Sequence, residues 1–368
     1  MPLVVGVPRE TAPLENRVAL VPETILRLGR EGIQVVVEAG AGAAAYIPDA
    51  LYAEAGAQLV NRAAAHDVDV VARVQGPAAE DATFLRRGSI LIGFLRPLDD
   101  ARVVARLAEC GVTGMAMELV PRTTRAQKMD ALSAMATVAG YRAVLLAATA
   151  LPKFFPLLTT AAGTVRPAKV LVLGAGVAGL QAIATARRLG AVVSAYDVRA
   201  AAREQVESVG ARFVEIALET ADTEGPGGYA RALDEERGRL QVELLVPFIA
   251  DADVVITTAL IPGKPAPLLI TREAVEAMAP GSVIVDLAAA NGGNCALTRP
   301  GEVAVEDGVR ILAPLNLAAE MPLHASQMYS RTVGAMISEF HAEGVFRTDP
   351  EDEIFRAVCV THAGQALV

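Results

Sequence analysis

The sequence KVLVLGAGVAGLQAIATARRLGAVVSAYD, residues 169–197, decides the fold of this chain. Its first apolar run ends at Gly174, and Gly176 and Gly179 complete a G-x-G-x-x-G pattern before a helical stretch. A second apolar run follows and ends at Asp197. A strand, a Gly-rich turn, a helix and a second strand in this order are typical of a βαβ unit that binds a dinucleotide. The stretch therefore predicts a parallel sheet wound by helices.

The three glycines have different expected roles. Gly174 makes the tight turn, Gly176 lets the backbone approach a pyrophosphate, and Gly179 lets helix and strand pack closely. The helix that follows offers its first N–H groups to the phosphates. The candidate cofactor-binding residues of this turn are Gly174, Ala175, Gly176, Val177, Ala178 and Gly179.

Asp197 lies about twenty residues after the turn, where a carboxylate accepts hydrogen bonds from the adenosine ribose. A 2′-phosphate would be repelled there, so we expect NAD(H) as the cofactor rather than NADP(H). Val198 and Arg199 follow as further candidate cofactor-binding residues. Because an arginine can neutralise a 2′-phosphate, the sequence leaves open whether Arg199 relaxes this preference.

The composition narrows the class of protein further. The chain has 368 residues, which predicts two domains, and 53% are hydrophobic. The net charge is −9 and aromatic residues make up 4%, which argues against nucleic-acid binding. Three distant cysteines and four scattered histidines predict neither disulfides nor a metal site.

The N-terminus lacks the pattern of a signal peptide, and Arg142 interrupts the apolar stretch 131–152. We therefore expect no direct membrane insertion.

Short β-branched runs alternate with helical patterns in two series, which predicts two Rossmann-like parallel-sheet domains of the α/β class. A long Ala-rich helix, about 128–150, separates the series, and a helical pattern at about 325–343 precedes a β-like tail. The expected domains are 1–132 plus 322–368, and 133–321. The predicted strands are residues 3–7, 34–39, 68–74, 89–95 and 113–119 in the first series, and 169–174, 192–197, 212–216, 254–259 and 282–288 in the second.

Longer motifs outside the Gly-rich turn resemble the alanine dehydrogenase/pyridine nucleotide transhydrogenase family. They are VGVPRE with ENRVALVPE, EAGAGAAAYIPDALYAEAGAQLV, ITTALIPGKPAPLLIT and GSVIVDLAAANGGN. The resemblance covers nearly the whole chain and implies two α/β domains that flank a cleft, with the C-terminal segment returning to the first domain. It adds Thr258, Ala259 and Leu260, in the ITTAL stretch, to the candidate cofactor-binding residues.

The family has two branches, and the dehydrogenase branch needs an acid–base group because oxidation of an amino acid moves a proton as well as a hydride. Where that branch has a lysine, a histidine and an aspartate, this sequence has Gln75, Arg96 and Ala290. Arg17 remains, but an arginine alone performs no acid–base chemistry. These departures favour the transhydrogenase branch of the family.

The stretch PRTTRAQKMDALS, residues 121–133, is similar to the loop that holds the nicotinamide in the transhydrogenase branch. The resemblance implies that Arg122, Gln127 and Asp130 are catalytic and that Ser133 also contacts the nicotinamide end of NAD(H). Spacings of three predict that Gln127, Asp130 and Ser133 lie along one side of a helix start. Hydride transfer between two nicotinamides needs orientation but neither acid nor base. Without the resemblance, these residues are also compatible with an ordinary polar helix start.

The segment 218–230 is similar to the mobile loop of the same branch, so Gly228 and Tyr229 are expected to fold over bound nucleotide. A surface loop without this role is the alternative.

The resemblance favours the NAD(H)-binding alpha component of a proton-translocating transhydrogenase, which ends at Val368 as a split subunit. It implies a homodimer, an NADP(H)-binding beta subunit, membrane-spanning partner subunits, and a peripheral cytoplasmic location on the membrane face. An alanine-dehydrogenase-like oxidoreductase and an NAD(H)-sensing regulatory subunit are the alternatives.

Overall fold

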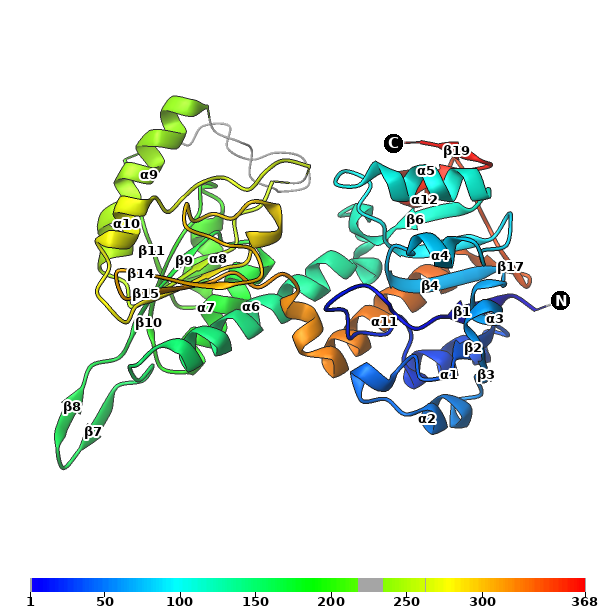
Figure 1. Ribbon diagram of the computed structural model, residues 1–368, viewed down its shortest axis with the longest axis horizontal. Coiled ribbons are helices and arrows are strands. Elements are labelled where there is room, and N and C mark those ends of the chain that lie inside the picture. Colours follow the sequence, from blue (N-terminus) through cyan, green and yellow to red (C-terminus); the bar gives the residue numbers. More distant parts are fainter. Residues whose placement is uncertain (1, 218–233, 262, 368) are drawn as a thin grey trace. The chain divides into compact units, whose positions relative to one another are not determined.

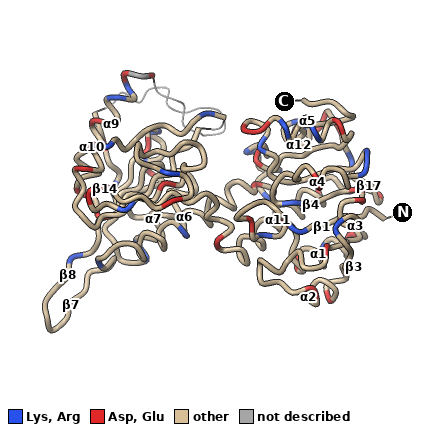
Figure 2. The backbone as a smooth tube through the Cα atoms, in the orientation of Figure 1, with Lys and Arg blue, Asp and Glu red and all other residues tan. Residues whose placement is uncertain are grey.

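The computed structural model describes residues 2–217, 234–261 and 263–367. The chain forms two compact units (Figure 1). Unit 1 comprises Met1–Met135 with Ala318–Val368, and unit 2 comprises Ala136–Leu317. Lys, Arg, Asp and Glu positions are interspersed along both units (Figure 2).

Unit 1 is built on a largely parallel sheet with the strand order β19-β18-β6-β5-β4-β1-β2-β3 among its described residues. The six parallel strands have the 3-2-1-4-5-6 order of a doubly wound dinucleotide-binding sheet. Its strands are β1 (Val4–Val7), β2 (Gln34–Glu38), β3 (Gln58–Val60), β4 (Val70–Gln75), β5 (Ile90–Phe94), β6 (Thr113–Ala116), β18 (Cys359–His362) and β19 (Gln365–Ala366).

The C-terminal segment completes unit 1. Strand β18 pairs antiparallel with β6. In α11 (Pro322–Phe340), the buried Ser326 and Ser330 hydroxyls accept hydrogen bonds from the N–H groups of Val18 and Val21 at 3.0 and 2.9 Å. The other helices of unit 1 are α1 (Pro22–Arg30), α2 (Asp49–Glu54), α3 (Arg62–His66), α4 (Ala79–Ala82), α5 (Ala101–Cys110) and α12 (Glu353–Val358), with 3-10 turns η1 (Ala43–Ala45), η2 (Met117–Leu119) and η3 (Gln127–Met129) and a small hairpin, β16 (His341–Ala342) and β17 (Val345–Phe346).

Unit 2 repeats the same topology. Its described sheet has the order β11-β10-β9-β12-β13-β15-β14, with β14 antiparallel at the edge. The parallel strands again follow the 3-2-1-4-5-6 order. Its strands are β9 (Lys169–Leu173), β10 (Val192–Tyr196), β11 (Arg212–Phe213), β12 (Val254–Thr257), β13 (Val283–Asp286), β14 (Val303–Glu306) and β15 (Val309–Leu312), and its helices include α7 (Val177–Arg188), α8 (Ala202–Ser208), α9 (Glu235–Ala250), α10 (Arg272–Glu276) and the 3-10 turn η5 (Ala289–Asn291).

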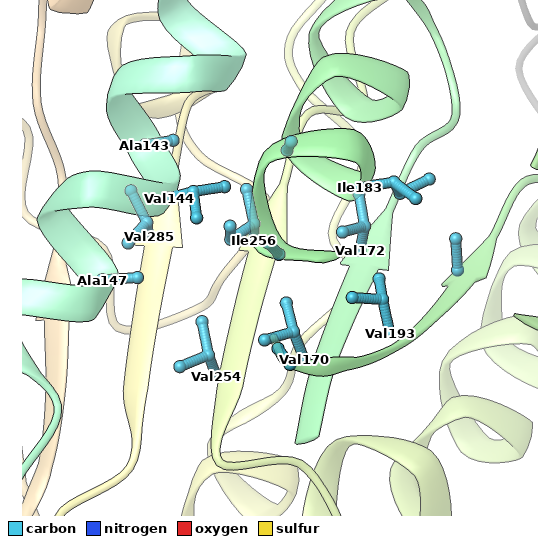
Figure 3. Packing of buried hydrophobic residues seen from close by; sticks show 14 of the residues in the cluster. Ala143, Val144, Ala147, Val170, Val172, Ile183, Val193, Val254, Ile256 and Val285 are labelled. Carbon is cyan, nitrogen blue, oxygen red and sulfur yellow. The ribbon is translucent and has the colours of Figure 1, made fainter. Parts of the chain in front are cut away.

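The long helix α6 (Ala131–Ala150) packs against one face of this sheet (Figure 3). Its Ala143, Val144 and Ala147 are fully buried with β-branched residues of the strands. In the described part of the chain, α6 alone is long and apolar enough to cross a membrane by length and composition, and 39% of its most apolar window is buried. A core helix meets the same criterion.

The predicted strands of both series are confirmed, with shifted ends. The predicted stretch 113–119 ends as a strand at Ala116 and continues as η2. The helix predicted at 128–150 begins at Ala131, because Asp130 has a ψ of 82° that no helix adopts. Between α6 and β9 the chain also forms an unpredicted hairpin of β7 (Leu158–Thr160) and β8 (Gly163–Val165), which projects from unit 2 (Figure 1).

Candidate functional site

The Gly-rich turn has the geometry that the sequence predicts. Gly174 has a φ of +98°, a conformation that favours glycine. A Cβ on Gly179 would lie 1.9 Å from the carbonyl oxygen of Gly174, so only a glycine lets α7 begin this close to the end of β9. A Cβ on Gly176 would meet no described atom within 4 Å. Gly176 thus borders open space at the start of α7, where backbone N–H groups can bind a phosphate.

The strand order of unit 2 reverses between β9 and β12, and doubly wound sheets bind ligands at the carboxyl ends of the strands there. Thr258, directly after β12, donates a hydrogen bond from Oγ1 to the Gly174 carbonyl at 3.0 Å. Asp197, directly after β10, accepts a hydrogen bond from the Ala175 N–H at 2.7 Å. Leu260, two residues beyond Thr258, is 44% exposed. The structure therefore brings the Gly-rich turn, Asp197 and the start of the 258–260 segment together at one edge of the sheet.

The Asp197 carboxylate is fully engaged by its neighbours. Its Oδ1 accepts from the backbone N–H and Nε of Arg199, both at 2.9 Å, and its Oδ2 accepts from Arg199 Nη2 at 2.9 Å and from Ala175. A carboxylate offers about four acceptor positions, so all are in use. A ribose hydroxyl can bind Asp197 only if the Arg199 guanidinium shifts, and Arg199 also offsets the negative charge that would repel a 2′-phosphate.

Asp286, at the end of β13, is a fully buried acid that the sequence does not single out. It accepts hydrogen bonds from the hydroxyls of Thr257 and Thr298, at 2.9 and 2.6 Å, and from the N–H of Asn294 at 2.8 Å. Hydrogen bonds to a buried carboxylate are strong because they offset its lost hydration. Asp286 thereby fixes the loop that carries Asn294.

Asn294 in turn holds the 258–260 segment. Its side-chain amide accepts from the Ala259 N–H at 3.2 Å and donates to the carbonyl oxygens of Ala259 and Pro267 at 2.9 and 2.8 Å. Both Asp286 and Asn294 lie in the GSVIVDLAAANGGN motif, but nothing in their spacing indicates which backbone groups they bind.

The segment 121–133 lies in unit 1. Arg122 and Gln127 are exposed, whereas Asp130 and Ser133 are partly buried. Asp130 Oδ1 accepts a hydrogen bond from the Ser133 N–H at 2.8 Å, so it caps the start of α6. The expectation that Gln127, Asp130 and Ser133 lie in one helix start is wrong, because Gln127 begins η3, Asp130 lies between η3 and α6, and Ser133 lies in α6.

The positions where an amino-acid dehydrogenase needs a cation and a base are occupied differently here. Arg17 is 4% exposed and donates to Glu15 from Nε at 2.7 Å and from Nη2 at 2.5 Å. Gln75 Nε2 donates to the same carboxylate at 2.8 Å. Burial by itself would raise the pKa of Glu15, but the hydrogen bonds and charge of Arg17 hold that pKa below its usual range. The Arg17 charge is therefore neutralised within unit 1.

The other two positions also lack acid–base chemistry. Arg96 donates through its backbone N–H to Glu118, while its side chain is largely exposed and contacts Asp99 at 3.2 Å. Ala290 lies in η5 and has no ionisable group. Gly228 and Tyr229, expected to cover bound nucleotide, lie outside the described residues.

The doubly wound sheets and the Gly-rich turn define a dinucleotide-binding α/β protein. Family models described as "Alanine dehydrogenase/PNT, N-terminal domain" and "Alanine dehydrogenase/PNT, C-terminal domain" match residues 6–139 and 143–368. The chain belongs to this family.

Among its relatives, an NAD(P) transhydrogenase alpha subunit of Rhodospirillum rubrum is 45% identical over 98% of this chain and 96% of that protein. "Alanine dehydrogenase" of Bacillus subtilis is 32% identical over 79% of this chain and 72% of that protein. A solved structure, "The crystal structure of transhydrogenase from Sinorhizobium meliloti", matches with a TM-score of 0.90 and 44% identity, over 99% of this chain and 100% of that one. The similarity is thus greater to the transhydrogenase branch.

Proposed function

We propose that this chain is the NAD(H)-binding subunit of a proton-translocating NAD(P) transhydrogenase. In this function, hydride passes directly between NADH and NADP⁺, and NADP(H) is bound on a partner subunit. One observation carries the proposal: Arg17 and Gln75 both donate hydrogen bonds to the buried Glu15, so the Arg17 charge is already paired and Gln75 offers an amino acid no charge. The names of the relatives with 45% and 44% identity support it.

Bound NADH supplies the hydride, and the residues of this chain orient it. The Gly174–Gly179 turn and the start of α7 bind the pyrophosphate, and Asp197 with Val198 and Arg199 binds the adenosine ribose. Thr258, Ala259 and Leu260 line the same edge of the sheet, where Asn294 holds the Ala259 backbone. Arg122, Gln127, Asp130 and Ser133 bind the nicotinamide end, with Gln127 nearest the second nucleotide. Transfer requires an approach of about 3–3.5 Å between the reacting atoms, which is a problem of positioning alone.

The proposal includes further subunits. NADP(H) binds a beta subunit, and protons cross the membrane in membrane-spanning subunits, so this chain is peripheral on the cytoplasmic face. The β7–β8 hairpin, which projects from unit 2 (Figure 1), supports a homodimer because it exposes apolar side chains that a second copy can cover. Leu157, just before β7, is 58% exposed, and Val165, at the end of β8, is 42% exposed. The proposed functional domains are 1–132 plus 322–368, and 133–321.

A two-part assay tests this function. The purified chain with NAD⁺ and L-alanine should show no reduction of NAD⁺, whereas the chain reconstituted with its membrane partners should transfer hydride from NADH to NADP⁺. In that complex, the Gln127→Asn variant should keep near-normal NADH affinity but transfer hydride more slowly. Robust alanine-dependent turnover by the chain alone would contradict the proposal in favour of an amino-acid dehydrogenase. An unchanged rate of hydride transfer in the Gln127→Asn variant would contradict the role proposed for Gln127.

A further inference from the structure

The segment that carries Gln127 has little regular structure of its own. Between Pro121 and Asp130 the structure contains only the three-residue η3. The backbone N–H groups of Ala126 and Gln127 donate to the Thr123 carbonyl at 3.1 and 3.0 Å. The side chains of Ala126 and Met129 are fully buried. These contacts fix the inner side of the segment, but Gln127 itself is exposed.

Two cations flank Gln127 and bind the same acid. Arg125 Nε contacts Glu339 Oε1 at 2.8 Å, and Lys128 Nζ contacts Glu339 Oε2 at 2.6 Å. Glu339 belongs to the last turn of the nineteen-residue helix α11 and its side chain is 16% exposed. One carboxylate therefore holds the chain on both sides of Gln127 and ties it to a long helix.

Arg125 also binds a second acid. Its Nη2 contacts Asp352 Oδ2 at 2.7 Å, and Asp352 Oδ1 accepts from the N–H groups of Ile354 and Phe355 at the start of α12. Asp352 is itself fixed by these cap hydrogen bonds, with 17% of its side chain exposed. Arg125 thus joins the segment to two helices of the C-terminal part of unit 1.

The charges of these four groups support one another. The hydrogen bond from Lys128, together with that from Arg125, holds the pKa of Glu339 below its usual range, although burial opposes this. The pKa of Arg125 is raised, chiefly by its hydrogen bonds to Asp352 and Glu339. These shifts favour the charged forms of Glu339 and Arg125, and networks of charged groups hold geometry better than single exposed pairs do.

We propose that Arg125, Lys128 and Glu339 are positioning residues for hydride transfer, which set the orientation of Gln127 and Asp130 by clamping η3 onto α11. This inference rests on the proposed function, because hydride transfer is the reaction for which Gln127 and Asp130 must be positioned. The three positioning residues hold the backbone on both sides of Gln127, which in the proposed function contacts the nicotinamide. A misplacement of about 1 Å at a reacting centre can slow a reaction about 10²-fold.

The test uses Arg125→Met and Glu339→Gln variants in the chain reconstituted with its membrane partners. We expect the rate of hydride transfer at saturating NADH and NADP⁺ to fall about tenfold in each, within the sensitivity to misplacement given above. The dissociation constant of NADH should change less than twofold, because the adenosine and pyrophosphate contacts are distant in sequence and unaltered. The two variants combined should lose little more than either alone. Arg125→Lys, which keeps a cation beside Glu339, should recover much of the rate.

Arg331→Met is the matched control, since Arg331 lies on the same helix and pairs with Glu23 at 3.2 Å, away from the 121–133 segment. It should leave the rate unchanged. Melting temperatures separate the two kinds of role: a clamp that is only structural would lower the melting temperature in Arg125→Met without changing the saturated rate, and that result overturns the inference. An equal loss of rate in Arg331→Met also overturns it. If the wild-type complex transfers no hydride at all, the proposed function fails instead.

Discussion

Replacing Gly176 and Gly179 separately with alanine tests which part of the turn serves the fold and which serves the cofactor. A Cβ at position 179 would lie 1.9 Å from the Gly174 oxygen, and real contacts of this kind are not below 3.0 Å. The start of α7 must then move away from β9 by about 1 Å, and overpacking of this kind costs about 1–3 kcal/mol. Gly179→Ala should lower both the free energy of unfolding and the affinity for NADH.

Gly176→Ala should separate these two effects. Its φ is −75°, which alanine adopts, and no described atom lies within 4 Å of the added Cβ. The free energy of unfolding should therefore change by less than about 0.5 kcal/mol. The methyl group instead fills the space where a pyrophosphate approaches, so NADH affinity should fall at least tenfold, which corresponds to about 1.4 kcal/mol.

Urea unfolding followed by circular dichroism, with calorimetric titration of NADH, measures both quantities. Gly29→Ala is a control within α1, where a Cβ also meets nothing within 4 Å. It should stabilise the fold by about 0.5–1 kcal/mol and leave NADH affinity unchanged. If Gly176→Ala binds NADH as tightly as the wild type, the pyrophosphate does not lie at this turn and the assignment of the site is wrong.

Three further predictions concern other parts of the chain. Glu15→Gln leaves Arg17 buried without a carboxylate and should lower the free energy of unfolding by about 3 kcal/mol at pH 7. The pKa of Glu15 in the folded protein lies below its ordinary 4.5, so ionised Glu15 stabilises the fold fully above pH 4.5. Urea unfolding should therefore show that the difference in the free energy of unfolding between wild type and Glu15→Gln shrinks as the pH falls below 4.5. Arg199→Met should raise the preference for NADH over NADPH in titrations; an unchanged ratio would show that Arg199 does not offset the acid. Leu157→Lys combined with Val165→Lys should convert the proposed dimer into a monomer by light scattering, and a monomeric wild type would refute the dimer.

The sequence predicts the Gly-rich turn well because all its causes are local. The roles of Gly174 and Gly179 follow from their spacing and from the strand and helix on either side, and the structure places both as expected. The short strand β3 is not among the predicted strands, because Gln58 and Leu59 are exposed and the stretch has no apolar alternation. Edge strands of this kind owe their form to pairing with a neighbour, which the local sequence does not encode.

Site residues that act through distant partners are equally hidden from the sequence. Asn294 binds Ala259, 35 residues earlier in the chain. Arg125 binds Glu339, which is 214 residues away. In the sequence, Asn294 and Arg125 look like ordinary polar loop residues, because their partners come close only in the folded chain. The predicted helix start differs from Ala131 for a related reason: the cap formed by Asp130 competes locally with continuation of the helix.

The two units share one strand order, yet only one has the features of a dinucleotide site among its described residues, and the difference lies at the switch point of each sheet. In unit 2 the turn after β9 opens at Gly176 onto the start of a helix. In unit 1 the corresponding strands are β1 and β4, and Glu10, three residues after β1, binds backbone N–H groups at the end of β4. Its Oε1 accepts from the Val74 N–H at 2.6 Å, and Arg73 Nη2 contacts its Oε2 at 3.4 Å.

Glu10 therefore accepts, from within the chain, hydrogen bonds of the kind that a phosphate would otherwise accept at this edge. Burial raises the pKa of its carboxyl, and the Arg73 guanidinium and the backbone hydrogen bonds from Val74 and Gln75 only partly oppose this. A nucleotide phosphate at the same edge would have to displace a buried acid that is already hydrogen-bonded. The topology alone offers two places for a dinucleotide. The third residue after each first strand distinguishes the two places: it is Gly176 after β9 and Glu10 after β1.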